Sequence, residues 1–220
     1  MALTKITGEG LGSLGTGNLT HGSDSGDTRF TLNSANQYTL VLKNAGNIAG
    51  QIGGSGSDVL RFSNAAGATI MEMNAGQITK PLQPAFSATV GTTQSNPSSS
   101  SRVAFNSEVF DQNADYDPSI YVFTAPVTGK YFLSISIRLD QPDTAADFIR
   151  FNIVTSNRGY NSSIFDLGNL SGDPNYWNMQ TAVLADMDAG DTAEVEIIYA
   201  GGAAQADIST ESFFSGCLVC

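Results

Sequence analysis

The sequence is short of charge, and this shortage excludes a class of partners. Charged residues make up only 14% of the 220, and 21 Asp and Glu against 10 Lys and Arg give a net charge of -11. No cluster of Lys or Arg offsets this charge locally, so phosphate backbones and anionic lipid headgroups are repelled. We therefore expect no nucleic-acid partner.

Cysteine and histidine are equally scarce. Cys217 and Cys220 are too few for the disulfide framework of a small secreted domain. They are expected to be inert apolar thiols on opposite faces of a strand, with an interchain contact or a metal as open alternatives. The single histidine, His21, lies in a polar N-terminal stretch, which argues against a Ser-His-Asp triad.

Long apolar runs and nucleotide or metal motifs are missing too. Residues 1–15 lack a basic n-region and an apolar h-region, and no run of about eighteen apolar residues occurs. We expect neither a signal peptide nor membrane insertion. Phosphate-loop, zinc-protease and EF-hand motifs are absent, and the many acids are interpreted as turn residues, with a glycosidase pair as an alternative. The chain is predicted not to be an enzyme and to need no cofactor.

What the sequence does contain is alternation of apolar and polar residues. In residues 131–140, Tyr131, Leu133 and Ile135 begin an apolar face while Ser134 and Ser136 lie on the other. Similar runs, separated by Gly, Pro, Asn or Asp, predict strands at 103–110, 120–123, 148–155, 177–186, 193–199 and 212–220. This succession of short strands and turns predicts an all-β sandwich or barrel.

Several predicted strands carry large apolar residues on both faces. The pairs are Ile153 with Val154, Ile197 with Ile198, and Phe213 with Phe214. A single sandwich buries one face of each sheet, so a second apolar face indicates a subunit interface.

The first eighty residues have a different composition. Residues 1–27 are rich in Gly, Thr and Ser and are expected to be a flexible arm that orders only on a partner. Residues 28–80 are predicted to be a glycine-rich stalk, because short strands ending in Asn-Ala-(Ala)-Gly recur at 40–46, 60–67 and 70–76. Three chains stacked around an axis, or a meander lying on the C-terminal domain, are both compatible with this repeat. Residues 77–84, with two prolines, are predicted to be a hinge.

Residues 84–220 resemble a C1q-like globular domain. The residues that match its aromatic signature, in order and at its spacing, are Phe105, Asp111, Tyr116, Phe123, Gly129 and Tyr131. Around them, the segment 123–132 reads FTAPVTGKYF and the segment 84–88 reads PAFSA, similar to the family's corner and opening strand. Leu133 and Ile135 stand where the signature has aromatic residues.

The resemblance implies an antiparallel jelly roll that assembles as a homotrimer. It also implies a candidate calcium site, because some members bind calcium near the trimer axis and Asp140, Asp143 and Asp147 crowd one loop here. Plain turn acids are the alternative interpretation of these three carboxylates.

An arm, a glycine-rich stalk and a C-terminal knob, in this order, resemble bacteriophage fibre and capsid decoration proteins. We therefore interpret the chain as a non-enzymatic trimeric virion surface protein, a tail or head fibre assembled in the host cytoplasm. Its arm would attach to another virion protein, and its knob would bind a host surface glycan or protein or decorate the capsid. A bacterial C1q-like protein of the cell or spore surface is the alternative, and a polysaccharide-cleaving spike is the least favoured.

Strand directions predict where the knob meets a ligand. Successive antiparallel strands put every second connection at one end, so loops 125–130, 157–160 and 187–191 are expected beside the stalk. Loops 91–101, 140–147, 168–176 and 201–206 are expected at the opposite end, where longer irregular loops suit recognition. Tyr176 and Trp177 are candidate stacking platforms for a sugar, with Asp143 and Asp173 as polar partners. A core position is the alternative for Trp177.

Overall fold

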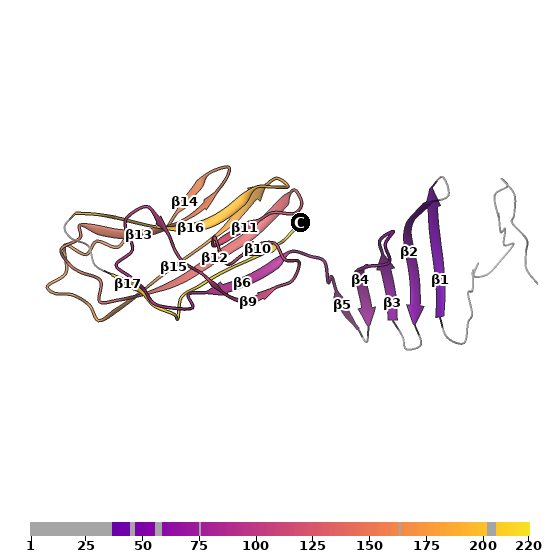
Figure 1. The fold of residues 1–220 in the computed structure, drawn as a ribbon, viewed down its shortest axis with the longest axis horizontal. Coiled ribbons are helices and arrows are strands. Elements are labelled where there is room, and N and C mark those ends of the chain that lie inside the picture. The colour runs from indigo at the N-terminus through magenta and orange to yellow at the C-terminus, as the bar shows by residue number, and fades with distance from the viewer. Residues whose placement is uncertain (1–36, 45–46, 56–58, 75, 163, 202–205) are drawn as a thin grey trace, which may run out of the picture.

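The residues that the structure describes form three antiparallel β-sheets (Figure 1). The computed structural model describes residues 37–44, 47–55, 59–74, 76–162, 164–201 and 206–220. This described part contains no helix, and so none long and apolar enough to cross a membrane. The predicted all-β class is confirmed, while the predicted arm, residues 1–27, lies outside the described residues.

The first sheet, which we call the stalk sheet, is a five-stranded meander at the N-terminal side (right in Figure 1). Its strands pair in chain order and are β1 (Gln37–Asn44), β2 (Asn47–Ser55), β3 (Val59–Ser63), β4 (Thr69–Asn74) and β5 (Gln77–Thr79). Asn64 makes the turn after β3, because its Oδ1 accepts hydrogen bonds from the Ala66 and Ala68 amides at 3.0 and 2.9 Å. The prediction of a hinge from residue 77 is wrong at its start, since residues 77–79 pair with β4.

The other two sheets face each other in a C-terminal sandwich, which we call the knob. Its first sheet comprises β7 (Gln94–Ser95), β17 (Asp207–Ile208), β12 (Gly129–Asp140), β18 (Phe213–Leu218), β6 (Ala85–Thr89) and β9 (Ser107–Asp111), with β15 (Tyr176–Met187) on the free edge of β12. Its second sheet comprises β10 (Tyr116–Asp117), β11 (Val122–Thr124), β16 (Thr192–Ala200), β13 (Phe148–Thr155) and β14 (Gly159–Asn161), with β8 (Ser101–Arg102) beside β16. This arrangement is the jelly roll predicted from the sequence.

The core between the two knob sheets is aromatic at the end nearest the stalk sheet. Phe86 on β6 is stacked on Tyr116 and on Phe123, with ring centroids 4.9 and 4.8 Å apart, and meets Phe214 edge-on at 4.9 Å. The Tyr116 hydroxyl donates to the Phe105 carbonyl at 2.8 Å. Burial raises the pKa of Tyr116 above its ordinary value.

The alternation that predicted β12, β13, β15, β16 and β18 locates all five, but it fails at residues 103–110. The chain there belongs to two sheets: β8 pairs with β16 in the second sheet, and β9 pairs with β6 in the first. Val103 and Phe105 between them are buried in the core as the chain crosses over. Similarly, in predicted strand 120–123, Tyr121 has a φ of 63° and the strand begins only at Val122.

Candidate binding surface

The connections of the knob gather at two ends, as alternating strand directions led us to expect. At the end next to the stalk sheet, the Ala125 amide donates to the Asp191 carbonyl at 2.7 Å. There the side-chain amide of Asn157 also donates to the Asp191 carboxylate at 2.7 Å. At the opposite end (left in Figure 1), the Gln141 amide donates to the Asn175 carbonyl at 2.9 Å, which joins loops 140–147 and 168–176.

Two predicted polar residues lie in these joined loops. The Asp173 carboxylate accepts hydrogen bonds from the amide and the hydroxyl of Thr144, at 2.9 and 2.6 Å. These bonds, the hydroxyl first, lower the pKa of Asp173 below its ordinary value. Asp143 accepts from the Ala145 amide at 2.7 Å, so one of its oxygens is used inside its own turn. Asp173 therefore acts first as a tie between loops.

The two predicted aromatic residues point to opposite sides of β15. Tyr176 pairs with Asp140 on the outer face, is 64% exposed, and has the Arg138 guanidinium 4.4 Å from its ring centroid. Trp177 lies beside Leu139 and is stacked on Phe165, with centroids 3.9 Å apart and planes 4° apart. They are thus two separate platforms, and one face of Trp177 is already occupied.

Arg138 is the residue at this end that sequence reasoning missed. Its guanidinium forms ion pairs with Asp140 at 2.8 Å and with Glu211 at 2.6 Å. The hydrogen bonds to these two carboxylates, that to Glu211 first, raise the pKa of Arg138. Alternation along residues 131–140 already put Arg138 and Asp140 on one face, whereas Glu211 and Tyr176 are brought there only by the fold.

The structure does not bring Asp140, Asp143 and Asp147 together as a calcium site. Among the described residues, no group of three or more His, Cys, Asp or Glu is placed to hold a metal ion. Asp140 is engaged with Arg138, Asp143 with its own turn, and the Asp147 carboxylate lies against Gly201. These residues are close in sequence but do not converge in space, because Asp140 is the last residue of β12 and Asp147 immediately precedes β13.

The outer face of the first knob sheet carries exposed apolar side chains away from this end. Phe132 pairs with Leu184 of β15 on one side and with Cys217 of β18 on the other. Phe132, Leu184 and Phe213 are 44%, 57% and 40% exposed, whereas the residues that follow them on their strands, Leu133, Ala185 and Phe214, are fully buried in the core. Between these residues lie small side chains such as Ser134 and Ser215, whose hydroxyls are 3.0 Å apart. We call this surface the outer knob face.

Of each apolar pair that sequence analysis singled out, one member is core. Phe214, Ile153 and Ile197 are fully buried between the sheets. Phe213 lies on the outer knob face, while Val154 and Ile198 are half-buried on the outside of the second sheet. Cys217 is half-buried and Cys220 is exposed, and both are free thiols.

The six signature residues form one structural unit. Phe105, Tyr116, Phe123 and Tyr131 are buried in the core. The Asp111 carboxylate accepts a hydrogen bond from the Tyr116 amide at 2.7 Å. A Cβ on Gly129 would lie 2.6 Å from the Cys220 carbonyl oxygen, so only glycine fits there.

This closed aromatic core between two antiparallel sheets, with connections at both ends, defines an all-β jelly-roll module. The chain belongs to the C1q domain family, whose model matches residues 85–219. Members of this family are typically non-enzymatic binding modules.

Solved structures similar to the knob are distant in sequence. The globular domain of zebrafish complement 1qA protein is 17% identical, with 63% of this chain and 98% of that one covered at a TM-score of 0.48. Murine APRIL is 14% identical, with 62% and 99% covered at 0.46. Eiger TNF from S. frugiperda is 14% identical, with 63% and 92% covered at 0.46. No curated protein matches the chain significantly.

Proposed function

We propose that the chain is the subunit of a homotrimeric, non-enzymatic binding protein whose protomers meet through the outer knob face. The observation that carries this proposal is the exposure of Phe132, Leu184 and Phe213 over a complete core. Contiguous apolar surface of this kind marks an interaction site in soluble proteins, because its burial is favourable. Homotrimers are common among C1q domains, which supports a second and third copy as the occupants.

The proposed ligand site is the loop end of the knob that is remote from the stalk sheet. Loops 140–147 and 168–176 are tied together there through Thr144 and Asp173, so they form a braced surface. Tyr176 offers an exposed ring, and Asp143 and Asp173 offer carboxylate oxygens, which suits a host surface glycan or protein. Trp177 is retained as a secondary contact, since the residue is 40% exposed although its ring is stacked on Phe165.

The proposed setting is the surface of a virion, as a tail or head fibre or a capsid decoration protein. The order of the chain supports this setting: a polar arm, a glycine-rich stalk and a C-terminal knob. In this proposal the arm, residues 1–27, binds another virion protein. Deleting it should leave a folded trimer that no longer enters particles; incorporation at the wild-type level would contradict the arm's role.

The trimer is tested by placing a charge on the outer knob face. We expect Phe132→Asp to shift the native mass from trimer to monomer, because three buried, unpaired carboxylates would each cost several kcal/mol. Ile120→Asp is the matched control, since Ile120 is 50% exposed and lies in the turn before β11, outside that face. If both variants keep the trimeric mass, the outer knob face is not the interface.

The ligand site is tested by adsorption of the purified trimer to host cells. Tyr176→Ala should reduce adsorption, whereas Leu170→Ala, in the same loop, should not. Asp173→Asn keeps an oxygen that can accept the hydrogen bonds from Thr144 but removes the negative charge. It therefore distinguishes a direct contact of the Asp173 charge with the ligand from the structural role of Asp173 in joining the two loops. Wild-type adsorption of Tyr176→Ala and Asp173→Asn, with the trimer intact, would leave a purely decorative role.

A further inference from the structure

The stalk sheet has one face that is apolar across its strands. In one row Leu40 of β1 pairs with Ile52 of β2, Ile52 with Phe62 of β3, and Phe62 with Met71 of β4. In the next row Leu60 pairs with Met73, and Met73 with Ile78 of β5. Together with Leu42, two residues along from Leu40, these side chains form what we call the apolar stalk face.

The opposite face of the same sheet is polar. Arg61 of β3 faces Glu72 of β4, and their side chains form an ion pair at 2.6 Å. Around this pair lie Gln51, Ser63, Asn74, Gln77 and Thr79, and the face also carries Val41 and the buried Val59. Ile70, at the bulge of β4, is 48% exposed. The face that carries Arg61 and Glu72 is therefore suited to contact with water, whereas the apolar stalk face is not.

The apolar stalk face has no second layer over it among the described residues. The stalk strands pack chiefly against each other, and Leu42 and Ile78 remain 48% and 61% exposed. An isolated layer of this kind is not stable, because a sheet needs another element to bury its apolar face. A layer must therefore be supplied from outside the described part of one chain.

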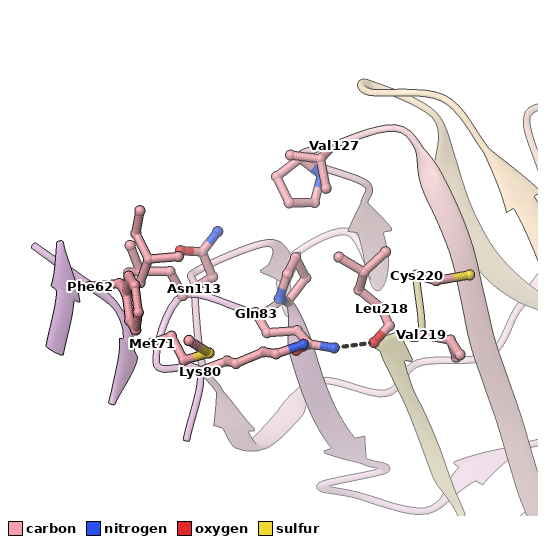
Figure 2. A pocket seen from close by; sticks show the side chains of 13 residues that line it. Phe62, Met71, Lys80, Gln83, Asn113, Val127, Leu218, Val219 and Cys220 are labelled. Carbon is pink, nitrogen blue, oxygen red and sulfur yellow. Dashed lines mark hydrogen bonds between the residues drawn. The ribbon is translucent and has the colours of Figure 1, made fainter. Parts of the chain in front are cut away.

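Residues 80–84, between β5 of the stalk sheet and β6 of the knob, form a neck that is fixed by hydrogen bonds. The Gln112 side-chain amide donates to the Lys80 and Gln83 carbonyls at 3.0 and 2.7 Å. The Gln83 side-chain amide in turn donates to the Leu218 carbonyl (Figure 2). These bonds tie the short neck to the end of β18, so the stalk sheet stays next to the base of the knob.

The apolar stalk face is continuous with the outer knob face across this neck. Phe62 and Met71 line a pocket of about 520 Å³ together with Leu218, Val219 and Val127 of the knob (Figure 2). Beside it, Ile78 lines a second hollow with Ala85 and Cys217, and the polar side chains of Lys80, Gln83 and Gln112 line the same hollow. Cys217 pairs with Phe132, so the apolar surface runs from the stalk sheet through Cys217 onto the outer knob face.

From this continuity we infer that the apolar stalk face is an interface between copies of this chain. Three stalk sheets form the walls of one shared core, with Phe62 and Leu60 of the central strand β3 turned towards the axis and the Arg61–Glu72 pairs turned to water. The inference rests on the proposed homotrimer, because a threefold axis through the knobs brings the three stalk sheets together. A second copy is the favoured occupant, since the side chains of its apolar stalk face carry no charge and this face adjoins the proposed knob interface.

The experiment uses single cysteines in the full chain, with Cys217→Ser and Cys220→Ser to remove the native thiols. Phe62→Cys lies on the apolar stalk face, and Ser63→Cys, the next residue on β3, is the matched control on the polar face. The cysteine-free background must first show the trimeric mass, because Cys217 borders the outer knob face; Cys217→Ala replaces Cys217→Ser if it does not. Each variant is diluted to the lowest concentration that retains the trimeric mass and treated with bismaleimidoethane, which links two thiols on separate chains. A parallel sample receives a monofunctional maleimide.

We expect Phe62→Cys to give covalent dimers and to react slowly with the monofunctional reagent, and Ser63→Cys to react quickly without dimers. Equal dimer yields from the two variants in an intact trimer would overturn the inference and leave the proposed trimer standing. A protected Phe62→Cys that gives no dimers would also overturn it, because residues 1–36 or another segment of the same chain would then cover the face. A monomeric mass of the unsubstituted chain would instead remove the proposed trimer itself.

Discussion

Phe213 and Phe214 are neighbours on β18 with opposite roles, and truncating each of them separates folding from assembly. Phe214 is fully buried, with its ring centroid 4.9 Å from that of Phe86 and 5.9 Å from that of Phe105. Phe214→Ala leaves a cavity in this aromatic cluster and should cost about 3–5 kcal/mol of unfolding free energy. Phe213 lies on the outer knob face and is 40% exposed in one chain.

The cost of Phe213→Ala falls on the trimer instead. Full burial of a Phe side chain contributes about 2–3 kcal/mol, so the 40% that is exposed in one chain is worth about 1 kcal/mol when the trimer covers it. Three copies add up to about 3 kcal/mol, which is on the order of a hundredfold in the trimer dissociation constant.

The two effects are measured by different assays. Denaturant unfolding at high protein concentration should move to lower denaturant for Phe214→Ala, and native mass across a dilution series should show earlier dissociation for Phe213→Ala. A Phe213→Ala protein whose dissociation is unchanged would refute the assignment of this face to the interface. An unchanged unfolding midpoint of Phe214→Ala would refute the described core.

Three further outcomes are expected. Gly216→Ala should lower the unfolding free energy by about 1–3 kcal/mol, because its Cβ would lie 2.6 Å from Leu133 and 2.8 Å from Phe86; an unchanged denaturation midpoint would contradict the packing. The hydrogen bond from Lys130 lowers the pKa of Asp186, so this pair stabilises the fold at neutral pH and the stabilisation is lost as the pH falls below about 4. Lys130→Met should raise the pKa of Asp186 in an NMR titration, and an unchanged pKa would rule out the pair. Trp177→Ala removes the ring stacked on Phe165 and should cost about 2 kcal/mol of stability, with thermal melting as the check and an unaltered melting temperature as the contrary result.

The fold was largely predictable from local pattern. Alternation along residues 131–140 and 148–155 gave β12 and β13, because a strand with one buried face repeats every two residues. The crossing at residues 103–106 was not predictable in this way. Val103 and Phe105 alternate as in a strand, but which sheet each neighbouring segment joins depends on pairing with β16 and β6, far along the chain.

The candidate site was predictable only in part. The gathering of loops at two ends follows from strand direction, and the opposite orientations of Tyr176 and Trp177 follow from their adjacency in a strand. The partners do not follow, since Phe165 and Glu211 reach Trp177 and Arg138 through long-range packing. The expected calcium set failed for a different reason: Asp140 is paired with Arg138, and Asp143 accepts a hydrogen bond within its own turn.

The central claim is that this chain functions as a homotrimer joined through apolar faces of its knob and stalk sheet. The most direct measurement is the native mass of the full chain at micromolar concentration. A homotrimer has three times the 23.1 kDa of one chain, and this is the mass that we expect. A mass of one chain at that concentration, with the knob folded, would contradict it.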